Sequence, residues 1–280
     1  MRILVTGATG QLGTELMRAL AERAELIGLD LPELDVTRDD CVEQIAGRAP
    51  SVVVHAGALT NVDGCERDPA RAMAVNAEGT RRVADACRKA GARLLYLSTD
   101  FVFDGAKRTP YTEDDRPAPL SVYGRSKLEG ERATVSVPGW TIVRTAWLYA
   151  AHGTNFVRTI LAKALAGEHL RVVDDQVGSP TYAADLADAI RLLIAGQHTG
   201  LYHLTNSGAC SWFAFTQEIL RQAGLTTPLA PITTAALNRP AARPAYSALA
   251  HRAWEAVGFR PLRPWPEALA AMLKQRASGA

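Results

Sequence analysis

The stretch of sequence that decides the fold is Arg2-Ile3-Leu4-Val5-Thr6-Gly7-Ala8-Thr9-Gly10-Gln11-Leu12-Gly13. Its apolar start predicts a strand over Arg2–Thr6, and the leucine spacing that follows predicts a helix from about Gln11 to Arg23. Gly7, Gly10 and Gly13 would serve the tight turn, the close approach of a pyrophosphate and the packing of helix on strand. Since a helix N-terminus also presents N–H groups to phosphates, we interpret this stretch as a dinucleotide phosphate loop rather than a plain turn.

Outward from this loop, short apolar runs alternate with helical patterns. Further strands are expected at 26–29, 51–55, 93–98, 141–144, 171–173 and 201–205, and further helices at 69–90, 122–133, 155–166 and 183–195. This alternation predicts an α/β fold with a Rossmann-type doubly wound parallel sheet. The proline-rich tail indicates short elements and rigid loops, which we interpret as a smaller C-terminal substrate lobe. We assign 1–146 and 177–206 to the dinucleotide-binding domain, and 147–176 and 207–280 to the lobe.

The composition excludes several classes of partner. The formal net charge is +2 without any basic block, so nucleic-acid binding and attachment to a membrane surface are not expected. No long uncharged apolar segment suggests a membrane span, and the N-terminal apolar run is too short for a signal peptide. The 4 cysteines are dispersed, as in a protein of the reducing cytoplasm, and we predict a cytoplasmic location.

One acidic residue bears on the choice of dinucleotide. Asp30 ends the second expected strand, where a carboxylate can accept both hydroxyls of the adenosine ribose and would repel a 2′-phosphate. The alternative is a solvated loop acid, and Arg38 is the nearby cation that could receive a 2′-phosphate. The sequence favours NADH and leaves NADPH open.

The catalytic prediction rests on Tyr123 and Lys127, which lie four residues apart on one face of an expected helix. A nearby ammonium would lower the pKa of the phenol, so that Tyr123 could give its proton to a carbonyl oxygen as hydride reaches the carbon. Thr99, at the end of the fourth strand, is the expected third member, holding the substrate oxygen. The alternatives are a surface tyrosine–lysine pair and a threonine that only caps its strand.

In their order along the chain, these elements resemble the extended short-chain dehydrogenase/reductases, and within them the dTDP-4-dehydrorhamnose reductases. The resemblance covers nearly the whole chain. It rests on segments that begin at Gly7 (GATGQLG), Thr60 (TNVD), Ser98 (STDFVFDG), Pro119 (PLSVYGRSK), Arg144 (RTAWLY), Asn155 (NFV), Asp174 (DDQVGSPT) and Gly200 (GLYHL).

The resemblance implies roles that spacing alone does not give. Gly10, Gln11 and Leu12 would contact the cofactor phosphates, and Asp30 the adenosine ribose. Further cofactor contacts would be Asp35 and Val36 beside the adenine, and Ala56, Ala58, Leu59 and Thr60 on the nicotinamide side. Tyr123 and Lys127 are also expected to contact the cofactor, with Lys127 holding the nicotinamide ribose. The sugar nucleotide would contact Val62, Thr99, Asp100, Phe101, Tyr123 and Trp147.

This chain departs from the family pattern at three places. Phe101 stands where the family often has tyrosine, which removes one hydroxyl from the sugar site. Some members bind Mg²⁺ through glutamates at a dimer interface; Glu15 matches the first, but Ala184 stands at the second, so we predict no metal and leave a homodimer open. The family's A-R-R-P-x-N-S segment reads Ala242-Arg243-Pro244-Ala245-Tyr246-Ser247 here.

Three functions remain in competition at this point. The first is reduction, by NADPH or NADH, of the C4 ketone of the dTDP-linked 4-ketosugar that leads to dTDP-L-rhamnose. The second is another sugar-nucleotide enzyme of this fold, such as a 4-epimerase or a ketoreductase for a different deoxysugar. Dehydration is disfavoured because Phe101 follows Asp100 where dehydratases need a glutamate. The third is a non-catalytic regulatory subunit, which would not need an intact Thr99, Tyr123 and Lys127.

Overall fold

The computed structural model describes residues 1–278, and its centre is a six-stranded parallel sheet in the order β10-β5-β4-β3-β1-β2. The strands of this sheet are β1 (Arg2–Thr6), β2 (Glu25–Leu29), β3 (Val52–His55), β4 (Arg93–Thr99), β5 (Thr141–Thr145) and β10 (Gly200–His203). The chain order reverses between β1 and β3, which leaves a crevice at the carboxyl ends of these strands. The Rossmann-type prediction is confirmed.

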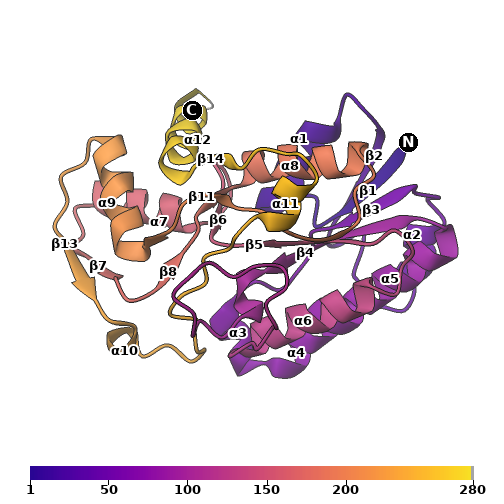
Figure 1. Cartoon of the computed structure of the whole chain (residues 1–280), viewed down its shortest axis with the longest axis horizontal. Coiled ribbons are helices and arrows are strands. Elements are labelled where there is room, and N and C mark those ends of the chain that lie inside the picture. The colour runs from indigo at the N-terminus through magenta and orange to yellow at the C-terminus, as the bar shows by residue number, and fades with distance from the viewer. Residues whose placement is uncertain (279–280) are drawn as a thin grey trace.

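Helices cover both faces of the sheet (Figure 1). On one face, α1 (Gln11–Leu20) packs against α8 (Ala183–Ala195). On the other face lie α2 (Cys41–Ala46), α5 (Gly79–Ala90) and α6 (Val122–Thr134), with α3 (Val62–Arg67) and α4 (Pro69–Met73) beside α6. Because both faces are covered, the middle strands are buried on both faces, as in β3, where all four residues, three of them valines, are buried.

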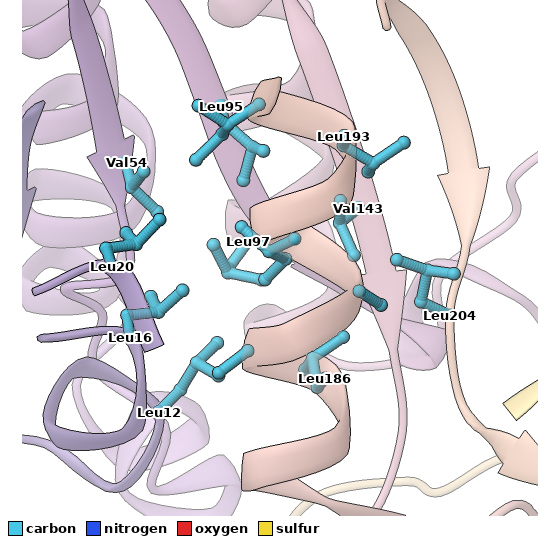
Figure 2. Close-up of a cluster of buried hydrophobic side chains, with 14 of the residues drawn as sticks. Leu12, Leu16, Leu20, Val54, Leu95, Leu97, Val143, Leu186, Leu193 and Leu204 are labelled. Atoms are coloured by element: carbon cyan, nitrogen blue, oxygen red, sulfur yellow. The ribbon is translucent and has the colours of Figure 1, made fainter. Parts of the chain in front are cut away.

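The core between α1, α8 and the sheet explains why α1 folds where the leucine spacing predicted it. Leu12, Leu16 and Leu20 line one face of α1 and point toward Val54 and Leu97 of the sheet (Figure 2). Leu16 is completely buried, and each such side chain contributes about 1.5–3 kcal/mol on burial. This packing fixes the helix N-terminus, and with it the glycine loop, against the end of β1.

The C-terminal lobe lies beside one end of the sheet and has its own hydrophobic cluster (Figure 1). Its helices are α7 (Phe156–Leu165), α9 (Trp212–Ala223), α10 (Thr234–Leu237) and α12 (Trp265–Ser278), while α11 (Arg252–Ala256) packs on β10. Short two-stranded pairs complete the fold: β7 (Leu170–Val173) with β13 (Leu229–Ile232), β6 (Leu148–Tyr149) with β9 (Thr181–Tyr182), β8 (Val177–Gly178) with β12 (Cys210–Ser211), and β11 (Asn206–Ser207) with β14 (Leu262–Pro264).

Two features differ from the sequence expectations. The tail is more regular than its prolines suggested, because α9 contains none and Pro266 occupies the first turn of α12, where the missing N–H has no helical partner. The helix expected over 69–90 is interrupted by a π-helical turn, Ala74–Glu78, between α4 and α5. That turn carries the buried Asn76, whose contacts belong to the site.

Candidate active site

The glycine loop after β1 has a backbone that side chains would not tolerate. Gly7 has φ of +69°, and a Cβ there would lie 2.6 Å from the Gly57 nitrogen. A Cβ on Gly13 would lie 2.0 Å from the Gly7 oxygen. The N-cap of α1 is Gly10, which offers no side-chain cap to the first N–H groups of the helix. An uncapped helix N-terminus behind a bare backbone loop fits a phosphate-binding role.

The side chain of Gln11 makes a different contact from the expected one. Its Nε2 donates to the Thr154 carbonyl at 3.3 Å, and its Oε1 accepts from Asn155 Nδ2 at 3.0 Å. The side chain therefore joins the glycine loop to the segment that leads into α7. The expected phosphate contact of Gln11 would then use its backbone N–H, like that of Leu12.

Asp30 lies at the end of β2 beside the glycine loop, as the ribose assignment requires. Its Oδ2 accepts from the backbone nitrogen of Thr9 at 3.1 Å and from Thr9 Oγ1 at 2.5 Å. The two residues expected beside the adenine have contacts within the protein. Asp35 accepts hydrogen bonds from Thr37, and these bonds lower the pKa of its carboxyl. Val36 packs against Gly79. Arg38 forms an exposed ion pair with Asp40.

The loop after β3, which carries Ala56, Ala58, Leu59 and Thr60, is held by a residue that the sequence reasoning missed. Asn76 Oδ1 accepts from the Leu59 nitrogen at 2.8 Å, and its Nδ2 donates to the Leu59 oxygen at 3.0 Å. The same Nδ2 donates to Ser126 Oγ at 3.0 Å, on the helix that carries Tyr123. Asn76 thus ties the expected nicotinamide loop to the catalytic helix. Its π-helical turn, a feature frequent at functional sites, is the signal that only the structure reveals.

The structure brings Thr99, Tyr123 and Lys127 together at the carboxyl edge of the sheet. Thr99 ends β4; its hydroxyl donates to Asp100 Oδ1 at 3.0 Å and accepts from the Phe101 nitrogen at 3.2 Å, and it lies close enough to the Tyr123 phenol to influence its pKa. Tyr123 lies in the first turn of α6, whose N-cap Ser121 accepts from Gly124, and Lys127 follows one turn later. The Lys127 ammonium lies 4.2 Å from the centre of the Tyr96 ring. All three members are buried, so the alternative of a surface pair does not hold.

Burial shifts the pKa values of this group in ways that the sequence could not predict. We expected Lys127 to lower the pKa of Tyr123; instead, burial raises the pKa of Tyr123 far above its ordinary value, and the nearby Thr99 hydroxyl opposes this only in part. Burial also lowers the pKa of Lys127 to about 7, although Glu131 opposes the shift. Glu131 is itself held by Arg144, whose Nη2 lies 2.7 Å from Glu131 Oε2.

Asp100 and Phe101 follow Thr99 but face different surroundings. Asp100 is buried, and both of its oxygens accept hydrogen bonds from protein hydroxyls, those of Thr99 and Ser247. Burial raises the pKa of its carboxyl to about 6, partly offset by these bonds. Phe101 packs edge-to-face on Tyr123, with ring centres 5.6 Å apart, and lines the large cavity next to the site.

That cavity, of about 360 Å³, lies between the sheet edge and the C-terminal lobe. Trp147, in a left-handed conformation with φ of +46°, stacks on Trp212 with ring centres 3.5 Å apart. The other lining residues include the cationic side chains Lys163, Arg171, Arg239 and Arg243 and the aromatic Phe156. Flat aromatic surfaces beside cations suit a base and a diphosphate.

An acidic residue of the TNVD segment holds the 239–243 segment, whose arginines line the cavity. Asp63, at the start of α3, accepts from Arg243 Nη2 at 2.9 Å, from Arg239 Nη1 at 3.3 Å and from the Ala241 nitrogen at 3.3 Å. Burial alone would raise the pKa of Asp63, but the two arginines outweigh it and hold the pKa below its ordinary value. Its neighbour Val62 packs in the small cluster around Tyr123.

The glutamate expected at a metal-linked interface has protein partners here. Glu15 is buried; its Oε2 lies 2.7 Å from Arg18 Nη2, and its Oε1 lies 3.0 Å from His152 Nε2. Position 184 is a buried alanine. No cluster of three or more His, Cys, Asp or Glu side chains suited to a metal ion occurs within residues 1–278.

With this geometry described, comparison with known proteins decides the family. The family model described as "RmlD substrate binding domain" matches residues 1–278. A Streptomyces griseus protein named dTDP-4-dehydrorhamnose reductase is 47% identical over 96% of this chain and 91% of its own length. The chain belongs to the dTDP-4-dehydrorhamnose reductase family.

Two further proteins are similar to this chain, one in sequence and one in structure. A Streptomyces antibioticus protein named "Probable dTDP-4,6-dihydroxy-2-methyloxan-3-one 4-ketoreductase" is 45% identical, covering 96% of this chain and 93% of its own. The crystal structure of dTDP-4-dehydrorhamnose reductase from Bacillus anthracis in complex with NADP superposes with a TM-score of 0.95 at 39% identity, covering 98% of this chain and 99% of the other. The family resemblance seen in the sequence is confirmed.

Proposed function

We propose that this chain reduces the C4 ketone of dTDP-4-dehydro-6-deoxy-L-mannose to dTDP-L-rhamnose, with hydride from NADPH or NADH and a proton from Tyr123. The observation that carries the proposal is the buried Thr99–Tyr123–Lys127 group at the carboxyl edge of the sheet, with Phe101 packed between Tyr123 and the cavity. The names of the 47% identical relative and of the NADP complex support the substrate and the type of cofactor. A non-catalytic subunit would not need this group.

The residues present fit a nicotinamide dinucleotide. The α1 N-terminus and the glycine loop would hold the diphosphate, Asp30 the adenosine ribose, and the 56–60 loop the nicotinamide. Thr145 lies beside Thr99 in the pairing of β4 with β5. Its Oγ1 is buried without a hydrogen-bond partner in the described part of the chain, so it is free to bind a polar group of a ligand. When bound, NADPH or NADH supplies the hydride.

The catalytic residues would divide the remaining work. Tyr123 gives its hydroxyl proton to the ketone oxygen, and its high pKa means that the phenol keeps this proton until an alkoxide develops beside it. Lys127 lies one turn away and would stabilise the resulting phenolate as a cation. Thr99, at the end of β4, would hold the ketone oxygen of the sugar. Stacked Trp147 and Trp212 would form one wall for the sugar nucleotide.

A second candidate is reduction of a different dTDP-linked 4-ketosugar. The 45% identical relative carries the name of such a 4-ketoreductase, and Phe101 and the Arg243–Ser247 segment depart from the rhamnose pattern around the cavity. Both candidates share the proton donor and differ only in the sugar. An epimerase is less well supported, because the close relatives named above are reductases.

A panel of dTDP-4-ketosugars, each assayed with NADPH and with NADH at 340 nm, tests the proposal. Fastest oxidation with the rhamnose precursor is the expected result, and a higher kcat/KM on another ketosugar would favour the second candidate. No oxidation with any of them would contradict both. Cofactor that stays bound through purification would instead indicate an epimerase.

The domain division, the cellular location and the oligomeric state are also proposals. We keep the division into a dinucleotide-binding domain (1–146, 177–206) and a substrate lobe (147–176, 207–280). Most members of the two main hydrophobic clusters follow this division, but Trp254 packs in the cluster of the sheet, and Tyr182 and Ala184 pack in that of the lobe. No helix within residues 1–278 is long and apolar enough to cross a membrane. The cytoplasmic location and a homodimer remain predictions, which fractionation and light scattering would test.

A further inference from the structure

The ammonium of Lys127 contacts an aromatic ring rather than a polar side chain. Lys127 is 3% exposed, and its Nζ lies 4.2 Å from the centre of the Tyr96 ring. Within residues 1–278 this nitrogen makes no hydrogen bond and no ion pair. Because burial disfavours a charge, a buried cation without polar partners needs another interaction to stay charged and in place.

The acid nearest to Lys127 along the helix has other partners. Glu131 follows one turn later on α6; its Oε1 accepts from Ser98 Oγ at 2.5 Å and from Arg144 Nε at 2.8 Å. Its Oε2 accepts from Arg144 Nη2 at 2.7 Å. Glu131 therefore favours the charged form of Lys127 from a distance, without forming an ion pair with it.

The place of the Tyr96 ring beneath α6 depends on a glycine in that helix. Tyr96 lies within β4, a strand that α6 covers, and it is completely buried. Its hydroxyl donates to the Lys127 carbonyl oxygen at 3.4 Å, and a Cβ on Gly130 would lie 2.2 Å from this hydroxyl. Because Gly130 carries no side chain, the ring can extend beneath the helix as far as Lys127.

The other titratable groups near the ammonium do not repel it. His55 lies beside Tyr96 in the pairing of β3 with β4, with ring centres 5.7 Å apart. Burial lowers the pKa of His55 to about 3, so its ring is uncharged near neutral pH. Burial raises the pKa of both Tyr96 and Tyr123, so both phenols keep their protons. Apart from the distant Glu131 carboxylate, the ring of Tyr96 is what attracts the cation.

We propose that Tyr96 is a positioning residue: the face of its ring holds the ammonium of Lys127 one turn from Tyr123 and uses none of its N–H donors. The face of an aromatic ring attracts a cation, and more strongly where water is excluded. An ammonium has three N–H donors, and the ring leaves all of them free for the groups that bind at the site. The proposal rests on the proposed function for the role of Lys127 in turnover, whereas the attraction between ring and ammonium does not.

The alkaline limb of the pH profile of kcat/KM gives the first test. Since the ring favours the charged lysine, its removal should lower the pKa of Lys127 further, and activity should be lost at a lower pH. Tyr96→Leu should move the limb down by about one pH unit relative to Tyr96→Phe, which keeps the ring. From a pKa of about 7, this is about a tenfold loss at pH 8 and about twofold at pH 6. Coincident limbs in the two variants would overturn the proposal.

A fluorinated series nearly keeps the volume of the ring while weakening its attraction for a cation, so it is informative even where Tyr96→Leu does not fold. Replacement of Tyr96 by phenylalanine, 4-fluorophenylalanine and 3,4,5-trifluorophenylalanine should move the limb to lower pH in that order. Tyr202 is the matched control, because it is a buried tyrosine of the same sheet whose hydroxyl donates to the Thr199 oxygen, and within residues 1–278 no cation lies over its ring. A limb that stays constant along the series at 96, or moves equally with the series at 202, would contradict the proposal.

A measurement without substrate separates this proposal from the proposed function. With lysine labelled with ¹³C at Cε, the Lys127 resonance is the one lost in Lys127→Met, and its titration gives the pKa of Lys127 in the free protein. This pKa should fall along the fluorinated series at 96 and stay constant along the series at 202. A constant pKa in both series would overturn the positioning role of Tyr96, whatever the enzyme reduces. A falling pKa at 96 together with no turnover by the wild type would overturn only the proposed function.

Discussion

The glycine loop at residues 7–13 and the segment at 239–247 face the same site from opposite sides, and they reach it by different physical means. The loop takes its shape from its own residues: Gly7 supplies the positive φ and Gly13 the close contact. The segment takes its shape from distant partners. Arg243 reaches Asp63, and Ser247 reaches Asp100.

The difference suits the two regions to different functions, cofactor binding for the loop and sugar recognition for the segment. A locally encoded loop can keep its shape whatever the rest of the chain binds, which suits a cofactor shared by many reductases. A segment held by long-range hydrogen bonds can differ between relatives without damage to the sheet, which suits the recognition of a particular sugar. Tyr123 is the proposed proton donor, so its substitution is expected to have the largest effect.

Tyr123→Phe should lower kcat by about 1000-fold, since a positioned general acid contributes about 10²–10⁴. NADPH affinity, measured by fluorescence titration, should stay near that of wild type, because the phosphate loop is untouched. Turnover near the wild-type rate would remove Tyr123 from the mechanism.

Gly7→Ala tests the local region, with Gly91→Ala as its control. Both glycines have a positive φ, near +65° to +69°, and alanine there costs about 1–2 kcal/mol. Only at Gly7 would the new Cβ meet backbone, at 2.6 Å; at Gly91 nothing lies within 4 Å. We expect NADPH binding to weaken at least about tenfold in Gly7→Ala alone. Equal NADPH affinity in both variants would contradict the assignment of the loop.

Arg243→Ala tests the distant region. Its ion pair with Asp63 is largely buried, with side-chain exposures of 14% and 15%, so its loss should raise the KM for the ketosugar by about tenfold. Arg239→Ala is the control: this arginine contacts the same carboxylate but is 52% exposed, and about a twofold change is expected. If Arg243→Ala raised the KM for NADPH instead of the KM for the ketosugar, the assignment of the sugar to the 239–247 segment would be contradicted.

The smallest effect concerns stability and pH. Burial lowers the pKa of Lys127 from 10.5 to about 7, so between these values the unfolded chain binds one more proton than the folded chain. Stability contributed through Lys127 must then rise with pH across this window. Urea denaturation from pH 7 to 10 should show wild type gaining stability relative to Lys127→Met, while Lys163→Met, at an exposed lysine, should show no such trend. A constant difference between wild type and Lys127→Met would mean that the lysine titrates normally.

Much of the sheet and of the cofactor half could be predicted from the sequence, because their signals are local. Leucine spacing, the position of the glycines and the four-residue separation of Tyr123 and Lys127 are all readable within one turn or one strand. The helix α9 was missed although its signals were present: Ser211 caps its start, and Gly224 ends it with φ of +64°.

The remaining parts of the site depend on burial and on long-range contacts. No sequence pattern around Asn76 predicts its hydrogen bonds to the Leu59 backbone and to Ser126. The sign of the pKa shift at Tyr123 was wrongly predicted because a sequence shows a neighbouring charge but not how deeply the phenol is buried. The partners of Asp100 and Asp63 lie 147 and 180 residues away, beyond any local pattern.

The proposed activity of this site is hydride transfer to C4 of a dTDP-linked 4-ketosugar. Its most direct test is incubation of the protein with dTDP-4-dehydrorhamnose and NADPH that carries deuterium at both hydrogen positions of C4 of the nicotinamide, followed by NMR of the product. We expect dTDP-L-rhamnose with deuterium at C4 of the sugar. A product without deuterium at that carbon, or recovered ketosugar with unchanged cofactor, would contradict it.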